Sequence, residues 1–121
     1  MNDLFIGGGG FNGIMFIGAL EYLHNNELLD IKRFYGCSIG CLIGILYITG
    51  NKPKDIFNFL LDIDLKNLIK YDISNVNKDN CLLNDDLFDK LIEKIPSEII
   101  TMKDFSDTYN TEINIHTTNI T

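Results

Sequence analysis

The stretches LFIGGGGFNG (residues 4–13) and FYGCSIGCLIG (residues 34–44) decide the fold of this chain. Each begins with apolar residues typical of a short buried strand and runs through glycines into an apolar segment. The segment over residues 12–23 is apolar almost all round, which predicts a buried helix. With a second strand over residues 32–35, these segments predict a βαβ unit with parallel strands and a right-handed crossover.

A βαβ unit fixes where its two loops lie. Both parallel strands end at the same edge of the sheet, so the residues that follow them become neighbours in space. The loop Gly8–Gly10 follows the first strand, and Ser38 follows the second. We therefore expect the glycine loop and Ser38 to lie side by side.

The composition narrows the class of protein. The chain has 121 residues, of which 45% are hydrophobic, enough for one domain with its own core. A formal net charge of -7 argues against nucleic-acid binding. Three cysteines without a C-x-x-C pair, and two histidines, do not predict a metal site.

The cysteine count and the apolar segments also set an expectation for the cellular location of the protein. An odd number of cysteines fits a reducing compartment. The N-terminus has no basic region followed by a long apolar stretch, so no signal peptide is expected. The most apolar segment, residues 39–49, is too short to span a bilayer and predicts a buried helix. We expect an intracellular, cytoplasmic protein.

The glycine loop has three interpretations. Its inward-pointing backbone N–H groups can bind a phosphate, or an oxyanion that forms only during a reaction. Gly8, Gly10 and Gly13 match the G-x-G-x-x-G pattern of a nucleotide- or phosphate-binding βαβ module. That pattern also requires an acidic residue at the end of the second strand, where Tyr35 and Gly36 stand instead. A tight turn without a ligand is the third interpretation.

The second loop carries a single hydroxyl. Gly36, Ser38 and Gly40 form G-x-S-x-G between a strand and a helix, the pattern of a nucleophile elbow. The N–H of Ile39 and the positive end of the following helix then point to the reaction centre. A turn of small residues without chemistry is the alternative. Cys37 is a rival nucleophile by type, but we interpret it and Cys41 as small apolar residues.

The rest of the chain predicts further helices and one strand. Pro53 suits the first turn of a helix over residues 53–61. Residues 62–80 predict loops with short helical pieces. Asn84 can cap an amphipathic helix over residues 84–95, and Thr101 begins a capping-box pattern. Alternation over residues 112–120 predicts a strand.

Together these motifs resemble the patatin-like phospholipases, acyl hydrolases with a PNPLA-type domain. The order of strand, glycine loop, helix, strand and G-x-S-x-G is the same, and residues 100–121 are similar to a later stretch of the family. The resemblance implies an α/β fold: a three-layer, mostly parallel sheet with helices on both faces. Residues 1–121 then make a partial domain, its N-terminal part, that is incomplete at the C-terminal side.

The resemblance also implies a Ser–Asp dyad and a lipid ester or phospholipid substrate, with peripheral membrane contact. Ser38 would be the nucleophile and Gly36 and Gly40 its elbow glycines. The N–H groups of Gly8, Gly9, Gly10 and Ile39 would form the oxyanion hole, next to the loop glycine Gly13. No metal or organic cofactor is implied.

Three departures from the family pattern bear on activity. Asn12 replaces a basic residue of the glycine loop, and Asn119 stands where the family often has aspartate. The family's base is an aspartate followed by glycine, and no aspartate of this chain precedes a glycine. A serine without a base is a poor nucleophile. A truncated, inactive homologue is thus the alternative, and an active enzyme would need a dimer or a complementing chain. His24 and His116 are both assigned structural roles.

Overall fold

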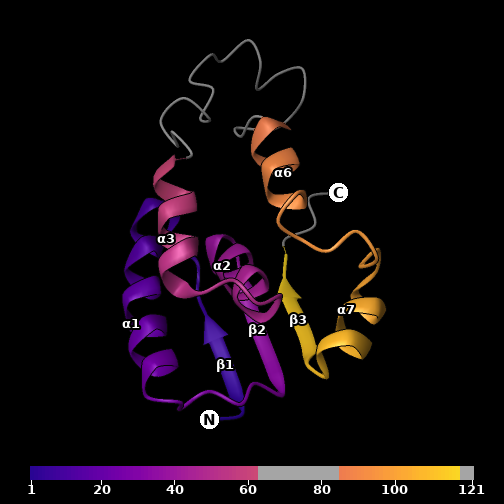
Figure 1. The fold of residues 1–121 in the computed structure, drawn as a ribbon, viewed down its shortest axis with the longest axis horizontal. Helices are drawn as coiled ribbons and strands as arrows, with labels where there is room; N and C mark the ends of the chain where they lie inside the picture. The colour runs from indigo at the N-terminus through magenta and orange to yellow at the C-terminus, as the bar shows by residue number, and fades with distance from the viewer. Residues whose placement is uncertain (63–84, 118–121) are drawn as a thin grey trace.

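The computed structural model describes residues 1–62 and 85–117 (Figure 1). The elements follow one another as β1 (Asp3–Ile6), the 3-10 turn η1 (Gly10–Gly13), α1 (Ile14–Asn25), β2 (Arg33–Cys37), α2 (Ile39–Ile48), α3 (Pro53–Asp62), α6 (Asp85–Ile92), α7 (Met102–Tyr109) and β3 (Glu112–His116).

The sheet is parallel across the described strands. Its order is β1-β2-β3, and in Figure 1 the three arrows point the same way. Leu4, Phe34 and Ile113 are successive register partners across the sheet. The predicted α/β class and the βαβ unit are confirmed. The carboxyl ends of all three strands therefore share one edge.

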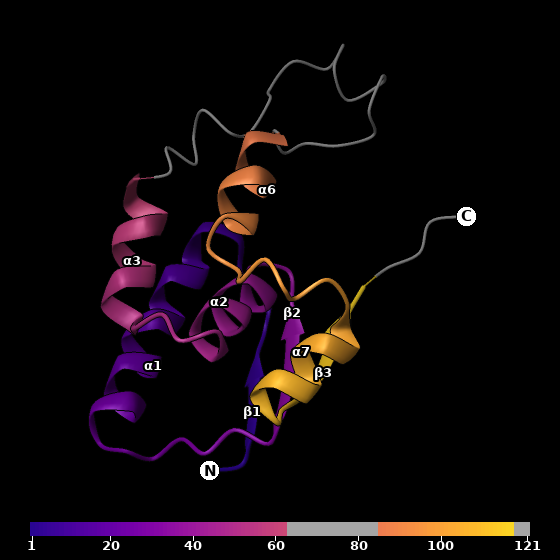
Figure 2. The same cartoon turned by 45° about the vertical axis from the view of Figure 1, so that its right-hand side comes forward.

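The core lies on one face of this sheet. Leu4, Phe34 and Ile113 point into it and are at most 9% exposed, whereas Phe5 on the other face is 72% exposed. Burial of a phenylalanine such as Phe34, at 0% exposed, contributes on the order of 2–3 kcal/mol. Helix residues that close the same core are Ile17, Leu20, Ile43, Leu46, Ile56, Leu60, Leu91 and Phe105. In Figure 2 the helices α1, α2 and α3 accordingly lie together on one side of the strands.

Element boundaries shift only slightly from the sequence prediction. The helix expected from residue 12 begins as α-helix at Ile14, because the tighter turn η1 precedes it. The second strand extends to Cys37, and the strand expected over 112–120 covers 112–116 within the described residues. The mixed segment 63–80 and the cap at Asn84 lie outside the described residues.

The capping box of α7 is confirmed. The Thr101 hydroxyl accepts a hydrogen bond from the Asp104 N–H at 3.1 Å, and the Asp104 carboxylate accepts one from the Thr101 N–H at 2.8 Å. These bonds to Thr101, backbone first, lower the pKa of Asp104 below its ordinary value. They satisfy two N–H groups that the first turn of α7 would leave unpaired.

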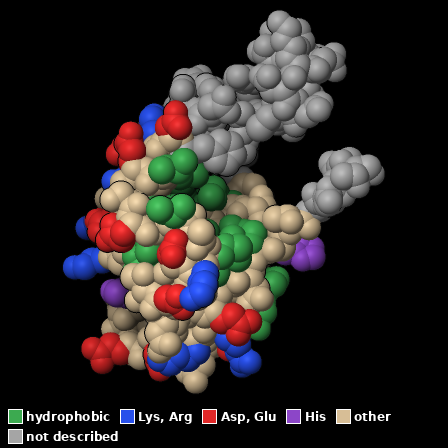
Figure 3. Space-filling view, turned by 90° about the vertical axis from the view of Figure 1, so that its right-hand side faces the viewer, with side chains coloured by type: hydrophobic (Ala, Val, Ile, Leu, Met, Phe, Trp, Pro, Cys, Tyr) green, Lys and Arg blue, Asp and Glu red, His purple; other side chains and the backbone are tan. Residues whose placement is uncertain are grey.

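The surface carries mixed charge. On the face shown in Figure 3, acidic and basic side chains are interspersed rather than gathered into blocks. Within residues 1–62 and 85–117, no helix is long and apolar enough to cross a membrane. In the same residues, no three histidine, cysteine or acidic side chains gather closely enough to hold a metal ion.

Candidate active site at the carboxyl edge of the sheet

Ser38 lies in an unusual turn between β2 and α2. Its φ is 52° and its ψ is -127°, a conformation that side chains rarely adopt. Such a conformation costs on the order of 1–3 kcal/mol. The side chain is exposed and makes no capping bond to α2, although serine is a preferred cap residue. The hydroxyl is therefore exposed at the surface and does not bond to the helix that it precedes.

The two elbow glycines let α2 return closely onto the sheet. A Cβ on Gly36 would lie 2.9 Å from the Cα of Cys41. A Cβ on Gly40 would collide with the carbonyl oxygen of Ile6 and lie 2.6 Å from that of Gly7. Because these atoms belong to the backbone, they cannot move aside as a side chain can. Both glycines thus permit the sharp turn that exposes Ser38.

The glycine loop lies against this turn, as the βαβ unit predicts. A Cβ on Gly8 would be 3.5 Å from the Cβ of Ser38. Gly10 has a φ of 52°, the left-handed conformation that glycine adopts without strain. A Cβ on Gly13 would lie 2.9 Å from Cγ1 of Ile39 and closer still to Cγ2. The loop therefore packs on the first residue of α2.

Exposed backbone lies on both sides of the serine turn. Gly8, Gly9 and Gly10 are exposed, and Ile39 is the first residue of α2, so its N–H has no acceptor within the helix. The helix end adds partial positive charge at the same point. Neutral donors around an exposed hydroxyl can stabilise negative charge that forms beside it.

A hollow of about 490 Å³ opens beside the loop. It lies over the less covered face of the sheet, and its lining residues are Phe5, Gly7, Gly8, Tyr35, Gly36, Cys37, Asn114, Ile115 and His116. Cys37 borders it as a free thiol, whereas Cys41 is buried. Burial raises the pKa of the Cys41 thiol, which keeps it protonated, as expected of a small core residue.

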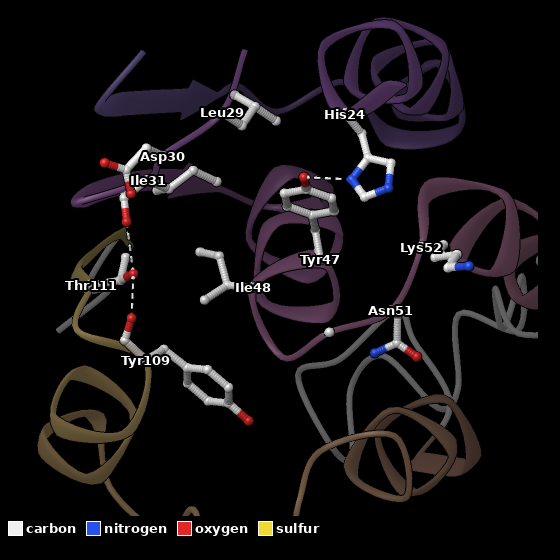
Figure 4. Close-up of a pocket in the computed structure, with 11 residues that line it drawn as sticks. His24, Leu29, Asp30, Ile31, Tyr47, Ile48, Asn51, Lys52, Tyr109 and Thr111 are labelled. Carbon is white, nitrogen blue, oxygen red and sulfur yellow. Dashed lines mark hydrogen bonds between the residues drawn. The ribbon is translucent and has the colours of Figure 1, made fainter. Parts of the chain in front are cut away.

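A second hollow, of about 290 Å³, lies at the opposite, amino end of the sheet (Figure 4). There the His24 ring and the Tyr47 hydroxyl share a hydrogen bond of 2.9 Å. Partial burial raises the pKa of Tyr47, so the phenol stays neutral. None of the predicted site residues lines this hollow, and the hydrogen bond gives His24 a structural role.

The structure brings part of the predicted site together: Gly8 lies against Ser38, and Gly13 lies against Ile39, whereas a Cβ on Gly10 would meet nothing within 4 Å. The other glycines shape the two turns. Sequence reasoning did not place His116. Its strand was predicted, but nothing in the sequence showed that β3 pairs with β2 and ends beside Cys37.

Comparison with known proteins identifies the family of the chain. The family model for patatin-like phospholipases matches residues 4–117. The chain therefore belongs to the patatin-like phospholipase family, a family of lipid acyl hydrolases.

Two proteins of Acanthamoeba polyphaga mimivirus are similar to this chain. "Uncharacterized protein R571" is 32% identical over 72 residues, which make up 58% of this chain and 24% of that protein. "Uncharacterized protein L620" is also 32% identical over 72 residues, 56% of this chain and 19% of that protein. The matched region is thus less than a quarter of either relative. No solved structure matches the chain significantly.

Proposed function

We propose that this chain is the N-terminal, nucleophile-bearing part of a serine acyl hydrolase that cleaves lipid esters. The observation that carries the proposal is the position of Ser38: an exposed hydroxyl in a positive-φ turn, its Cβ next to Gly8. A purely structural serine at a helix start would cap the helix, and this one does not.

In the proposed reaction, the Ser38 Oγ gives its proton to a general base, the role that the family resemblance assigns to an aspartate followed by glycine, and attacks the ester carbonyl carbon. The carbonyl π electrons move to oxygen, and the N–H groups of Gly8, Gly9, Gly10 and Ile39 hold the resulting oxyanion. Removing one such donor in an acyl-transfer enzyme lowers kcat by about 10²–10³-fold. Collapse of the tetrahedral intermediate breaks the bond to the alcohol oxygen, which takes the proton from that base, and water then hydrolyses the acyl-serine. The family resemblance supplies these roles, and the exposure of the loop and the position of Ile39 support them.

The substrate class follows from the family and from the hollow beside the loop. Phe5, Tyr35 and Ile115 give this hollow partly apolar walls, next to the proposed oxyanion donor Gly8. An aliphatic acyl chain buries apolar surface against such walls. We therefore propose a phospholipid or another lipid ester as substrate.

The test is covalent labelling with a fluorophosphonate, followed by peptide mapping. The wild-type chain is expected to be labelled at Ser38 and to hydrolyse p-nitrophenyl esters and phospholipid vesicles. Ser38→Ala should lose both signals, and Ser97→Ala, which changes an exposed serine of the α6–α7 connection, should lose neither.

The opposite outcomes are equally informative. Absence of both labelling and hydrolysis in the wild-type chain would contradict an active enzyme and favour an inactive homologue. Calorimetric binding of ATP or NAD by an unlabelled chain would favour a phosphate-binding module.

A further inference from the structure

The outer face of the sheet, opposite to the core, carries its side chains in rows. Side chains alternate between the two faces along a strand, and register partners on neighbouring strands lie side by side on the same face. Because Leu4, Phe34 and Ile113 point into the core, the residues next to them in sequence point outward. From the amino to the carboxyl end, the outer rows are Asp3, Arg33 and Glu112; then Phe5, Tyr35 and Asn114; then Cys37 and His116.

The hollow beside Gly8 lies over the last two of these rows. Every outer residue of both rows lines it, and no residue of the first row does. The apolar contact comes mainly from the middle row, where Phe5 is 72% exposed and Tyr35 is half-buried. The hollow therefore runs from the glycine loop along the strands toward the amino end, and it stops before Arg33.

The first row, which we call the charged row, consists of Asp3, Arg33 and Glu112. The Arg33 guanidinium donates two hydrogen bonds to the Asp3 carboxylate, at 2.7 and 2.8 Å. The hydrogen bond and the charge of Asp3 raise the pKa of Arg33 above its ordinary value, so the guanidinium stays charged. The Asn114 amide donates to the Glu112 carboxylate at 3.1 Å. An alkyl chain laid over this row would displace water from ions without replacing its hydrogen bonds, which is unfavourable.

The other end of the hollow opens at the serine turn. Gly8 and Cys37 both line the hollow there. A Cβ on Gly8 would be 3.5 Å from the Cβ of Ser38 and 3.6 Å from the Sγ of Cys37. The Ser38 side chain and the lining of the hollow thus border the same glycine, so an acyl group on Ser38 enters the hollow at its carboxyl end.

We propose that the hollow binds the acyl chain of the substrate and that the charged row limits this chain to about eight to ten carbons. The inference rests on the function proposed above and adds the chain length of the substrate to it. With a rise of about 3.3 Å per residue, Arg33 lies about 13 Å along β2 from Cys37, a span that an extended chain of about ten carbons covers. Phe5 and Tyr35 contact the middle of such a chain, and Arg33 is the residue that sets its limit.

The experiment measures binding by calorimetry for the saturated fatty-acid anions from hexanoate to tetradecanoate, below their micelle concentrations. These anions are products of the proposed reaction, and their binding requires no turnover. The Kd of the wild-type chain should fall by about twofold per added methylene up to decanoate, because an open hollow buries about half of each methylene. Dodecanoate and tetradecanoate should bind no more tightly than decanoate.

Two variants should move this limit in opposite directions. Arg33→Leu replaces the charged end of the hollow by an apolar side chain, so tetradecanoate should bind about tenfold more tightly than decanoate. Tyr35→Trp enlarges a side chain of the middle row and should move the limit to chains shorter than decanoate. Lys103→Leu is the matched control, because it also removes an exposed cation from an ion pair, Lys103 with Asp107 on α7, away from the hollow. It should bind all anions as the wild type does.

Two results would overturn the chain-length limit. One is a wild-type affinity that keeps rising beyond decanoate, and the other is an unchanged limit in both Arg33→Leu and Tyr35→Trp. Absence of binding at every length overturns the inference together with the acyl-chain part of the proposed function. Fluorophosphonate labelling tests the catalytic part separately: an unlabelled Ser38 with a decanoate limit that Arg33→Leu extends supports the acyl hollow and overturns only the catalytic role.

Discussion

At the carboxyl end of the sheet, glycines and one serine with a positive φ form the loops. At the amino end, side chains hydrogen-bond to one another and to the backbone. Gly36 and Gly40 bring α2 against backbone atoms, with no room for a side chain. At the other end, the buried hydroxyl of Thr111 donates to the carbonyl of Ile31 at 2.9 Å, and His24 binds Tyr47. At the carboxyl end, the glycine loop and the Ser38 hydroxyl remain exposed beside the hollow. At the amino end, polar groups form hydrogen bonds that stabilise the fold.

This contrast predicts that the carboxyl end tolerates added atoms least. In Gly40→Ala the new Cβ meets the carbonyl oxygens of Ile6 and Gly7, so α2 must move away from β1. We expect the free energy of unfolding to fall by about 3 kcal/mol. Urea unfolding followed by circular dichroism measures it.

The matched control is Gly18→Ala in α1. A Cβ there meets nothing within 4 Å, and alanine favours a helix by about 0.5–1 kcal/mol. This variant should be as stable as the wild type or more so. Equal stability of the two alanine variants would show that the close approach at Gly40 is not needed.

The amino end should respond to loss of a hydrogen bond rather than to added volume. Thr111→Val keeps the shape of the side chain but leaves the Ile31 carbonyl without its donor. We expect a loss of about 1 kcal/mol in the free energy of unfolding, because the group is buried. Thr108→Val, a change at an exposed position of α7, is the control. A larger loss of unfolding free energy in Thr108→Val than in Thr111→Val would contradict the role given to the Thr111 hydrogen bond.

The smallest effect concerns the cap of α7, the helix that leads into the amino end of β3. Because hydrogen bonds to Thr101 lower the pKa of Asp104, the folded state favours its charged form. That stabilisation is present above the ordinary aspartate pKa near 4 and is lost as pH falls through the lower folded value. The stability gap between wild type and Asp104→Asn should therefore narrow below about pH 4.

Thermal unfolding at pH 7 and at pH 3 measures that gap. Asp62→Asn, which removes a carboxylate at the exposed last residue of α3, is the matched control. A gap for Asp104→Asn that is constant with pH would contradict the role of the charged cap.

The carboxyl end was also the part that the sequence predicted best. A glycine loop and a serine turn, each after an apolar strand, require only the order of elements to become neighbours. The contacts of Gly8 with Ser38, and of Gly13 with Ile39, agree with that prediction. The capping box at Thr101 is equally local, since its two partners are three residues apart.

What the sequence could not supply depends on long-range pairing. Strands β2 (33–37) and β3 (112–116) are far apart along the chain, and only their pairing brings Cys37 next to His116. Alternation predicted the strand but carries no information on its neighbour. The same holds for Thr111, whose bond to Ile31 spans 80 positions. His24 and His116 belong to no motif, so the sequence could not show that they lie at opposite ends of the sheet.

The backbone at Ser38 has a consequence for stability. Glycine adopts a φ of 52° without a Cβ clash, so glycine would strain this turn less than serine does. A serine there keeps an exposed hydroxyl at a cost in folding free energy, a compromise between stability and chemistry that fits the proposed role of Ser38.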